Sequence, residues 1–237
     1  AATRLIGNFG DSWSNRQPAL NAALARLPAT LLLAGAALVT AVVGGGILGV
    51  ISATAGNSVL VAALRAFALA GQAVPTFWLG AMFILIFAVR LGWLPSSGNG
   101  SSAALVLPAL TLAAQPGSII ARLIATGMVE LRHSDFVRTA HSKGIAPRIV
   151  ALRHVLPNAI LPALGYVGLQ AGFLIGGAVV IESVFAWPGI GRLALQAATQ
   201  RDVPVIHAFV LLTAIGVMLI NLLVDLAVLL LDPRRSL

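Results

Sequence analysis

Residues Glu130–Pro162 read ELRHSDFVRTAHSKGIAPRIVALRHVLPNAILP and form a charged segment between two long apolar runs. The segment holds five of the chain's 15 cationic side chains: Arg132, Arg138, Lys143, Arg148 and Arg153. An arginine or lysine at the centre of a membrane helix costs about 2.5 to 3.5 kcal/mol. The segment must therefore lie in water, and because its pattern is more structured than that of a spacer, we interpret it as a docking surface.

The composition is that of a membrane protein. Of 237 residues, 59% are hydrophobic and only 9% are charged, whereas soluble domains carry about 25% charged residues. The mean hydropathy of +0.97 indicates a chain that crosses the membrane several times. The net charge of +8 is explained by basic cytoplasmic loops, so no nucleic-acid partner is expected. Because there is no cysteine, disulfides, thiolate catalysis and cysteine metal sites are excluded.

Five apolar segments reach spanning length, at about 27–51, 62–89, 103–129, 159–184 and 208–231. At 1.5 Å per residue, each is longer than the roughly 30 Å core of a bilayer. The segments are apolar throughout and do not alternate as the strands of a membrane barrel would. The sequence therefore predicts an all-α, polytopic membrane helical bundle.

The distribution of basic residues predicts the orientation. Placing the segment 130–158 in the cytoplasm also puts Arg65 and the C-terminal arginines there. The bias is moderate, because six arginines fall outside: Arg4, Arg16, Arg26, Arg90, Arg192 and Arg201. Five spans with a cytoplasmic C-terminus put the first residue outside, so we expect one preceding helix and a parent protein of six helices.

The predicted organisation has four parts. An extracytoplasmic N-terminal segment covers 1–26, and a transmembrane domain covers 27–231. Within that domain lie a cytoplasmic loop at 130–158 and an extracytoplasmic loop at 184–207. These are the two long connections, and we expect function in them and in the helix faces between them.

The first part of the charged segment has the residues of a short helix from Ser134 to Lys143. Ser134 can cap its start, and Asp135 complements the helix dipole. Gly144 can end it in the left-handed conformation.

Pro147 suits the first turn of a second helix, Pro147 to Val155, which we expect to end before Pro157. Two short helices with a glycine elbow make a knob that can fill a groove on another protein. A basic loop held against anionic lipid is the alternative, and local physics leaves both open.

The run FVRTAHSKG, followed by HVLP and NAILP, resembles the coupling-loop signature of ABC importer permeases. That signature reads Glu-Ala-Ala, three residues, Gly, nine residues, Ile, one residue, Leu-Pro. The matching positions are Arg138, Thr139, Ala140, Gly144, His154, Leu156 and Pro157. The departures at Arg138, Thr139 and His154 are similar to the variant of the peptide and nickel permease family, which typically reads RTARAKG.

Further runs resemble the same family in the same order along nearly the whole chain. They are RLPATLLLA at 26–34, VPTFWLG at 74–80, RLGWLP at 90–95, VFAWPGIGR at 184–192, RDVPVI at 201–206, and NLLVDL at 221–226. The family also begins with one helix before an outside segment, in agreement with the sixth helix expected above.

The resemblance implies a type I importer-like permease in the inner (plasma) membrane of a bacterium. Its implied partners are a second, homologous permease, two ATPase subunits and an extracytoplasmic substrate-binding protein, with ATP and magnesium on the ATPase. The implied cargo is a dipeptide, an oligopeptide, nickel or another metal chelate. The implied contacts with the ATPase are Asp135, Arg138, Thr139, Ala140, Lys143, Gly144, Leu156 and Pro157.

No enzyme is predicted in this chain. The only lysine, Lys143 in HSKGI, does not follow a glycine-rich phosphate-binding turn, so ATP hydrolysis must occur on a partner. The sequence contains no HExxH or GxSxG motif, and the four histidines are not clustered with carboxylates. We therefore expect no cofactor and no metal site in the chain itself.

Polar or helix-distorting residues within the spans are candidates for the translocation pathway: Gln72, Pro75, Gln115, Pro116 and Gln170. Simple helix packing is the alternative for each. Glu182 and Asp225 are ionisable groups near hydrocarbon, and we interpret both as interhelical hydrogen-bonding posts, with proton relay as the alternative.

The outer loop contains Trp187 and Arg192, followed by LALQAATQ, which has helical character. We expect a hairpin that dips into the bundle, with Trp187 in the interfacial aromatic belt. The resemblance implies that the loop closes an outer gate and faces the binding protein, and an ordinary interfacial loop is the alternative. Two other classes remain open, an ion-gradient-driven transporter and a membrane scaffold, although the span centres carry almost no charge.

Overall fold

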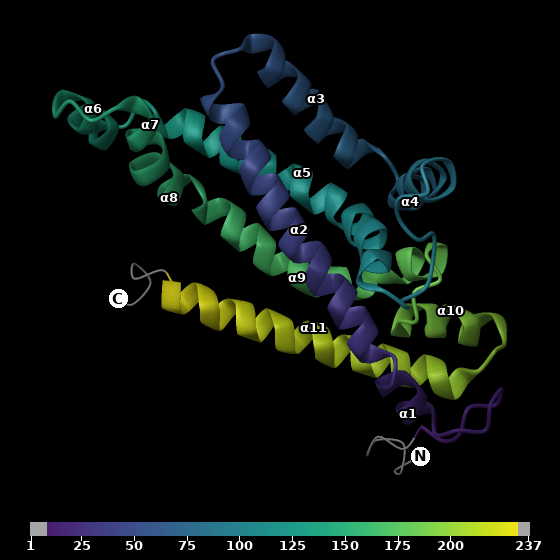
Figure 1. Ribbon diagram of the computed structural model, residues 1–237. Helices are drawn as coiled ribbons and strands as arrows, with labels where there is room; N and C mark the ends of the chain where they lie inside the picture. Colours follow the sequence, from purple (N-terminus) through teal and green to yellow (C-terminus); the bar gives the residue numbers. More distant parts are fainter. Residues whose placement is uncertain (1–8, 232–237) are drawn as a thin grey trace. The chain divides into compact units, whose positions relative to one another are not determined.

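The computed structural model describes residues 9–231, except for the side chains at 175, 177, 225 and 227–231. The interpretation of Asp225 as a hydrogen-bonding post and the orientation argument from the C-terminal arginines therefore lie outside what is described. Within 9–231 the chain consists of helices and connecting loops. This part of the chain has one isolated antiparallel β-bridge, between Asp11 and Pro18, and no β-strand. Figure 1 follows the helices in chain order. The all-α prediction is confirmed.

Three helical segments are long and apolar enough to cross a membrane: Ala19–Thr54, Ser102–Leu131 and Val203–Val224. Two bent pairs of helices raise this number to five if each pair is one span. Length and apolar composition are the reasons these segments are helices, because backbone groups in lipid must be satisfied within the segment. The first, third and last predicted spans thus correspond to single helical segments.

The prediction of one continuous helix for the second span, 62–89, was wrong. The structure has α3 at Ser58–Ala73, then α4 at Thr76–Phe83 continuing as η2 at Ile84–Arg90. The helix stops at Val74, which is extended at φ −81° and ψ 128°. The following Pro75 explains the stop, since a proline disfavours the helical conformation of the residue before it.

Contacts divide the chain into two compact units. One comprises Ala1–Ala37, Thr76–Leu112 and Ala171–Leu237, and the other comprises Leu38–Pro75 and Ala113–Gln170. The helices α2 (Leu27–Thr54), α5 (Val106–Leu131) and α9 (Leu161–Val184) each contribute to both units. We call the first unit, which contains the loop 184–207, the outer-loop unit. We call the second unit, which contains the loop 130–158, the coupling unit.

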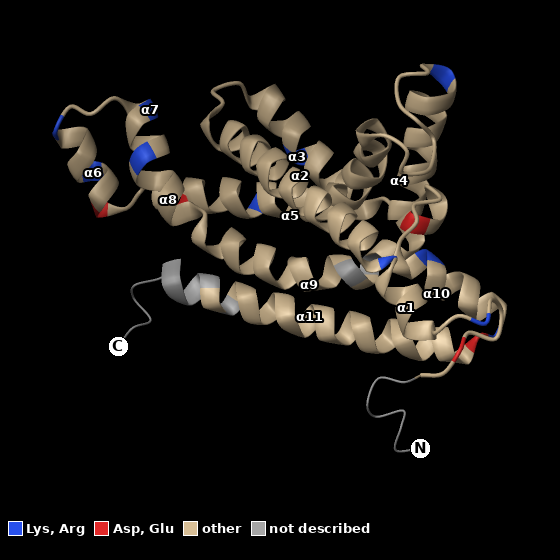
Figure 2. Cartoon of the chain, turned by 60° about the horizontal axis from the view of Figure 1, so that its bottom comes forward, with Lys and Arg blue, Asp and Glu red and all other residues tan. Residues whose placement is uncertain are grey.

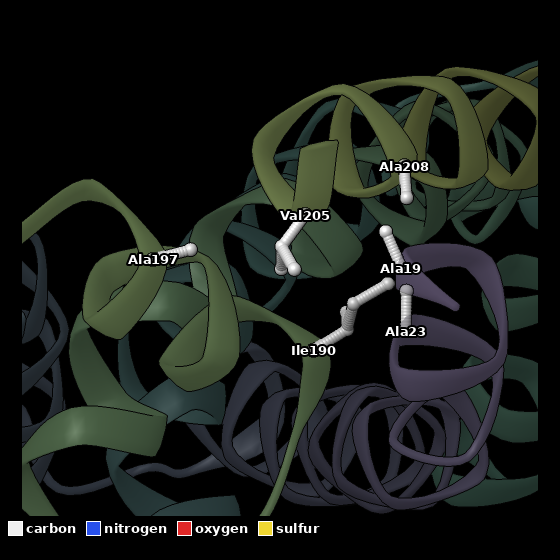
Figure 3. Packing of buried hydrophobic residues seen from close by; sticks show 6 residues of the cluster. All are labelled: Ala19, Ala23, Ile190, Ala197, Val205 and Ala208. Atoms are coloured by element: carbon white, nitrogen blue, oxygen red, sulfur yellow. The ribbon is translucent and has the colours of Figure 1, made fainter. Parts of the chain in front are cut away.

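The core of the outer-loop unit joins α1 (Ala19–Leu24), α10 (Ile190–Thr199) and α11 (Val203–Leu231). Small and branched apolar side chains from the three helices meet there, all buried: Ala19, Ala23, Ile190, Ala197, Val205 and Ala208 (Figure 3). Four of the six are alanines, which allow the helix backbones to approach closely.

In the coupling unit, glycines bring α2 and α5 together. A Cβ atom on Gly45 would overlap the backbone of Gly117, and one on Gly49 would lie 2.7 Å from the carbonyl oxygen of Ala121. Real Cβ atoms do not approach backbone so closely, so both positions require glycine. The pattern is that of small residues at membrane helix interfaces.

Candidate functional site

The charged segment begins with α6 at Asp135–Ser142. The helix lies within the range predicted for it, and Asp135 is in its first turn as expected. The predicted side-chain cap was wrong, because the Ser134 hydroxyl donates to the carbonyl of Leu131 at 2.6 Å and makes no cap bond. That carbonyl is at the end of α5, where carbonyls have no helical partner, and the bond to it turns the Ser134 oxygen away from the first N–H groups of α6.

The helix ends as predicted at Gly144, which has φ +74°. The Gly144 N–H donates to the carbonyl of His141 at 2.9 Å, and the Ile145 N–H donates to that of Ala140 at 3.3 Å. These two bonds form the Schellman arrangement, which requires a left-handed residue at the glycine position. A side chain at Gly144 would be strained in this conformation, although the space around it is open.

The second helix of the segment is longer than predicted. It runs through α7 (Pro147–Ile149), the π-helical turn η4 (Val150–Val155) and α8 (Leu156–Ala159). The expected end before Pro157 was wrong, because Val155 and Leu156 keep helical backbone angles and the helix continues through Pro157 to Ala159. The segment is therefore a two-helix knob with a glycine elbow, as predicted.

Within the knob α6 contacts η4, and the residues before α6 are bonded to α2. Val137 and Ala140 of α6 are buried, with only 4% and 6% of their surface exposed. The guanidinium of Arg132 donates to the carbonyl oxygen of Ala53, in the last turn of α2. A cation at this position satisfies an orphan carbonyl and interacts favourably with the helix dipole. Packing within the knob thus buries one side of α6, and a charged hydrogen bond ties the segment to α2.

The other side of α6 is exposed. Asp135, Arg138, Thr139, Lys143 and Gly144 are all exposed, whereas Ala140 is buried. In the second helix Leu156 is half-buried and Pro157 is exposed. Figure 2 shows acidic and basic residues along α6 and basic residues at α7. The structure therefore brings five of the eight predicted ATPase contacts together at the free face of α6 and the turn that follows it.

The outer-loop unit contains a second polar centre, around the fully buried carboxylate of Glu182 in α9. The Thr30 hydroxyl donates to Glu182 Oε1 at 2.5 Å and accepts from the Ile190 N–H at 2.9 Å. The Arg192 N–H donates to Glu182 Oε2 at 2.9 Å. A carboxylate at the first turn of α10 satisfies donors that have no helical partner and complements the dipole.

Two glycines make room for this carboxylate. A Cβ atom on Gly189 would overlap the carboxyl group of Glu182. A Cβ atom on Gly191 would lie 2.7 Å from the Cα atom of Val179 and 3.0 Å from Glu182 Oε2. The close approach of α10 to α9 thus explains why the VFAWPGIGR run has glycine at these two positions.

The two other gate candidates also lie in this centre. Trp187 is only 2% exposed, and its indole N–H donates to the carbonyl of Ala29 at 2.9 Å. Its predicted place in the interfacial belt was wrong, because the ring is packed inside the unit. The guanidinium of Arg192 donates to the carbonyl of Ala186 at 2.6 Å, and Ala186 has a positive φ of 49°. The outer loop is therefore a folded element with its own buried anchors.

Sequence reasoning missed Thr30. It lies in the RLPATLLLA run, but no local pattern connects it with Glu182, which is 152 positions later. Its fully buried hydroxyl links α2, α9 and the start of α10. The pairing with Glu182 makes that residue an interhelical hydrogen-bonding post, as predicted.

The pathway candidates on the spans are not gathered in one place by the contacts described. Gln72 is half-buried, and its amide donates to the carbonyl of Ala68 in its own helix at 3.2 Å. Pro75 and Gln115 are exposed, and Gln170 is buried. Gln72 also lines a cleft in the coupling unit. The described residues include no group of three or more histidine or acidic side chains that could hold a metal ion.

A third polar contact ties the N-terminal segment to α11. The Ser12 hydroxyl donates to the carboxylate of Asp202, which also accepts the backbone N–H groups of Trp13 and Ser14. Asp202 precedes α11 and accepts the Val205 N–H, which is the role of an N-cap. Burial raises the pKa of Asp202, but these hydrogen bonds outweigh it and hold the pKa below its usual range.

Solved importer structures share this fold. A chain from "Inward facing conformations of the MetNI methionine ABC transporter" aligns with a TM-score of 0.72 and 20% identity, covering 86% of this chain and 93% of that one. A chain of an amino acid ABC transporter crystallised with histidines aligns with a TM-score of 0.66 and 18% identity, covering 87% and 92%. At these identities the likeness concerns the fold alone. The fold and the site thus define a class of polytopic, all-α membrane protein that exposes a charged two-helix knob.

The chain belongs to the family described as binding-protein-dependent transport system inner membrane component, which matches residues 45–237. The glutathione transport system permease protein GsiC of Escherichia coli strain K12 is 40% identical over 219 residues, 92% of this chain and 72% of that protein. GsiC of Pectobacterium atrosepticum is 38% identical over 229 residues, 97% of this chain and 75% of that protein. The protein is thus an inner-membrane permease subunit of a binding-protein-dependent ABC importer, and the predicted family is confirmed.

Proposed function

We propose that this permease imports small peptides of the glutathione type, driven by ATP hydrolysis on a separate subunit that receives α6. The relationship to GsiC supports the peptide class. The absence of a phosphate-binding lysine motif from the sequence supports a separate ATPase. ATP and magnesium belong to that partner, and this chain supplies half of the translocation pathway.

The single observation that carries the coupling proposal is that α6 is buried on one face and exposed on the other. Val137 and Ala140 are buried, while Asp135, Arg138 and Thr139 are exposed on the same two turns. A short helix fixed on one face and polar on the other suits helix-in-groove recognition. When the groove moves, the bond from Arg132 to α2 carries the motion into the membrane helices.

The proposed assembly has a second permease, two ATPase subunits and an extracytoplasmic binding protein. The charged segment and the C-terminus lie in the cytoplasm, on the side of the ATPase, which agrees with the basic residues of the segment. The outer loop then faces the binding protein. The centre formed by Glu182, Thr30 and Trp187 holds that loop in one conformation and so acts as the fixed part of the outer gate.

The test is reconstitution of the complete complex in proteoliposomes, with the binding protein and labelled glutathione on the outer side. We expect uptake only when ATP and magnesium reach the ATPase. Uptake that persists without ATP and collapses with the ion gradient would contradict the proposal and favour a secondary transporter. Uptake of a nickel chelate in place of glutathione would contradict the peptide class.

The contact face is tested with Arg138→Glu. Reversal of one charge at a protein interface removes a charge-assisted contact of about 1.5 to 3 kcal/mol, so we expect the ATPase subunit to bind at least about tenfold more weakly. Arg90→Glu is the matched control, because Arg90 is exposed at the end of η2 and outside the knob. Equal weakening by both variants would refute the assignment of α6 as the contact.

A further inference from the structure

The cleft of the coupling unit that Gln72 lines has no role in the function proposed so far. It has a volume of about 510 Å³ and lies among α2, α3 and α5. Its apolar walls include Leu48, Leu64 and Leu69. Clefts of about 300 to 1,000 Å³ with apolar walls and a few polar groups are typical small-molecule sites.

The polar lining of this cleft carries both signs of charge. Arg65 of α3 and Arg122 and Glu130 of α5 all line it. Gln72 and Ser52 add hydrogen-bonding groups from α3 and α2. The cleft thus offers two guanidinium groups, one carboxylate and several neutral donors and acceptors.

These charged side chains have no oppositely charged partner within the described part of the chain. In the part of the chain that the structure describes, none of Arg65, Arg122 and Glu130 forms an ion pair, and all three are exposed. Each belongs to a helix that is a candidate span or half of one. The orientation proposed above puts Arg65 and Glu130 at the cytoplasmic ends of these helices, so the cleft lies at the inner end of the pathway, where water reaches charged side chains.

We infer that this cleft binds the substrate during translocation and that Arg65, Arg122 and Glu130 select a zwitterionic peptide. Guanidinium groups bind carboxylates in a two-pronged geometry, and a carboxylate binds an ammonium group. Glutathione carries two carboxylates and one ammonium, so two arginines and one glutamate match its charges one for one. The inference rests on the proposed function and deepens it by assigning the residues that determine specificity.

The test measures binding of labelled glutathione to the purified complete complex in lipid nanodiscs, without the binding protein. Loss of one charge-assisted pair weakens binding by about tenfold to a hundredfold. We expect this loss for Arg65→Gln and for Arg122→Gln, and partial recovery for Arg122→Lys, which restores the charge without the fork. Arg90→Gln is the control, because Arg90 is exposed and does not line the cleft.

Modified ligands test which cleft residue recognises each charged group of glutathione. The dimethyl ester of glutathione lacks both carboxylate charges, so the wild type should bind it more weakly, and the arginine variants should lose this preference. N-Acetylglutathione lacks the ammonium, and Glu130→Gln should no longer discriminate against it. If the cleft variants bind all three ligands as the wild type does, the inference is wrong.

Two comparisons separate the possible failures. If the wild-type complex imports glutathione with ATP and the cleft variants import it equally well, the specificity assignment is wrong while the proposed function stands. If the wild-type complex does not import glutathione, the proposed function itself fails. The measurements are repeated with phosphatidylethanolamine alone and with added phosphatidylglycerol, and an effect of the variants only with the anionic lipid would assign the cleft to a lipid headgroup and overturn the inference.

Discussion

Replacement of Thr30 by valine tests the buried polar centre of the outer-loop unit. Valine has nearly the same shape as threonine, so Thr30→Val removes two hydrogen bonds without leaving a cavity. The Ile190 N–H loses its acceptor at 2.9 Å, and the Glu182 carboxylate loses its donor at 2.5 Å. Because Thr30 and Glu182 are both fully buried, water cannot replace either bond without a rearrangement.

The magnitude follows from the two lost bonds. An unsatisfied buried N–H costs about 1 to 3 kcal/mol, and a hydrogen bond to a charged group contributes about 1.5 to 3 kcal/mol. Allowing for local relaxation, we expect the free energy of unfolding to fall by about 3 kcal/mol. In a chain of this size each kcal/mol corresponds to about 2 to 4 °C, so the melting temperature should fall by about 6 to 12 °C.

The assay is thermal unfolding of the detergent-solubilised complex, followed by the fluorescence of the tryptophans. Thr111→Val is the matched control. Thr111 is also fully buried, but its hydroxyl donates to the carbonyl of Leu107 in its own helix at 2.7 Å. That carbonyl is in the interior of α5 and keeps its helical bond, so the loss should stay below about 1 kcal/mol. Equal melting temperatures of the two variants would refute the reasoning.

Three further changes test other contacts. Gly45→Leu forces a side chain onto the backbone of α5, so we expect a loss of about 3 kcal/mol in thermal unfolding, whereas Gly46→Ala, which meets nothing within 4 Å, should have no such effect. Gly189→Ala displaces the carboxylate of Glu182 and should speed limited proteolysis of the outer loop. Because the pKa of Asp202 is lowered in the folded protein, the stability that it adds is complete above its ordinary pKa near 3.8 and disappears as the pH falls further. Asp202→Asn should therefore melt below the wild type at pH 7, with a difference that narrows as the pH falls below 3.8.

Local features of the charged segment could be predicted because they depend on neighbouring residues. Gly144 ends α6 because a left-handed residue is needed four positions after Ala140, and this requirement is visible in the sequence. Ser134 makes no cap bond because its side chain is turned toward Leu131, three positions earlier, where its hydroxyl donates to the carbonyl. The side chain has two local orientations, one that donates to this carbonyl and one that accepts from the first N–H groups of α6, and residue type alone did not decide between them.

The interrupted second span shows a limit of hydropathy. The apolar composition continues across Val74 and Pro75, so the run was predicted to be one helix. Pro75 was recognised as helix-distorting, but whether a proline kinks or ends a helix depends on what satisfies the freed backbone groups. In the structure, the helix ends at Ala73 and a new one begins at Thr76.

The sequence by itself determined the class of the protein, because apolar length, charge distribution and turn residues are properties of short stretches. It therefore predicted the membrane bundle and the charged knob, and the collinear runs predicted the family. Only the tertiary structure decided how the polar groups pair. Thr30 meets Glu182, and Arg132 meets Ala53, across 152 and 79 positions of chain. Such partners are chosen by packing between distant helices, and the spacing of residues along the chain does not specify them.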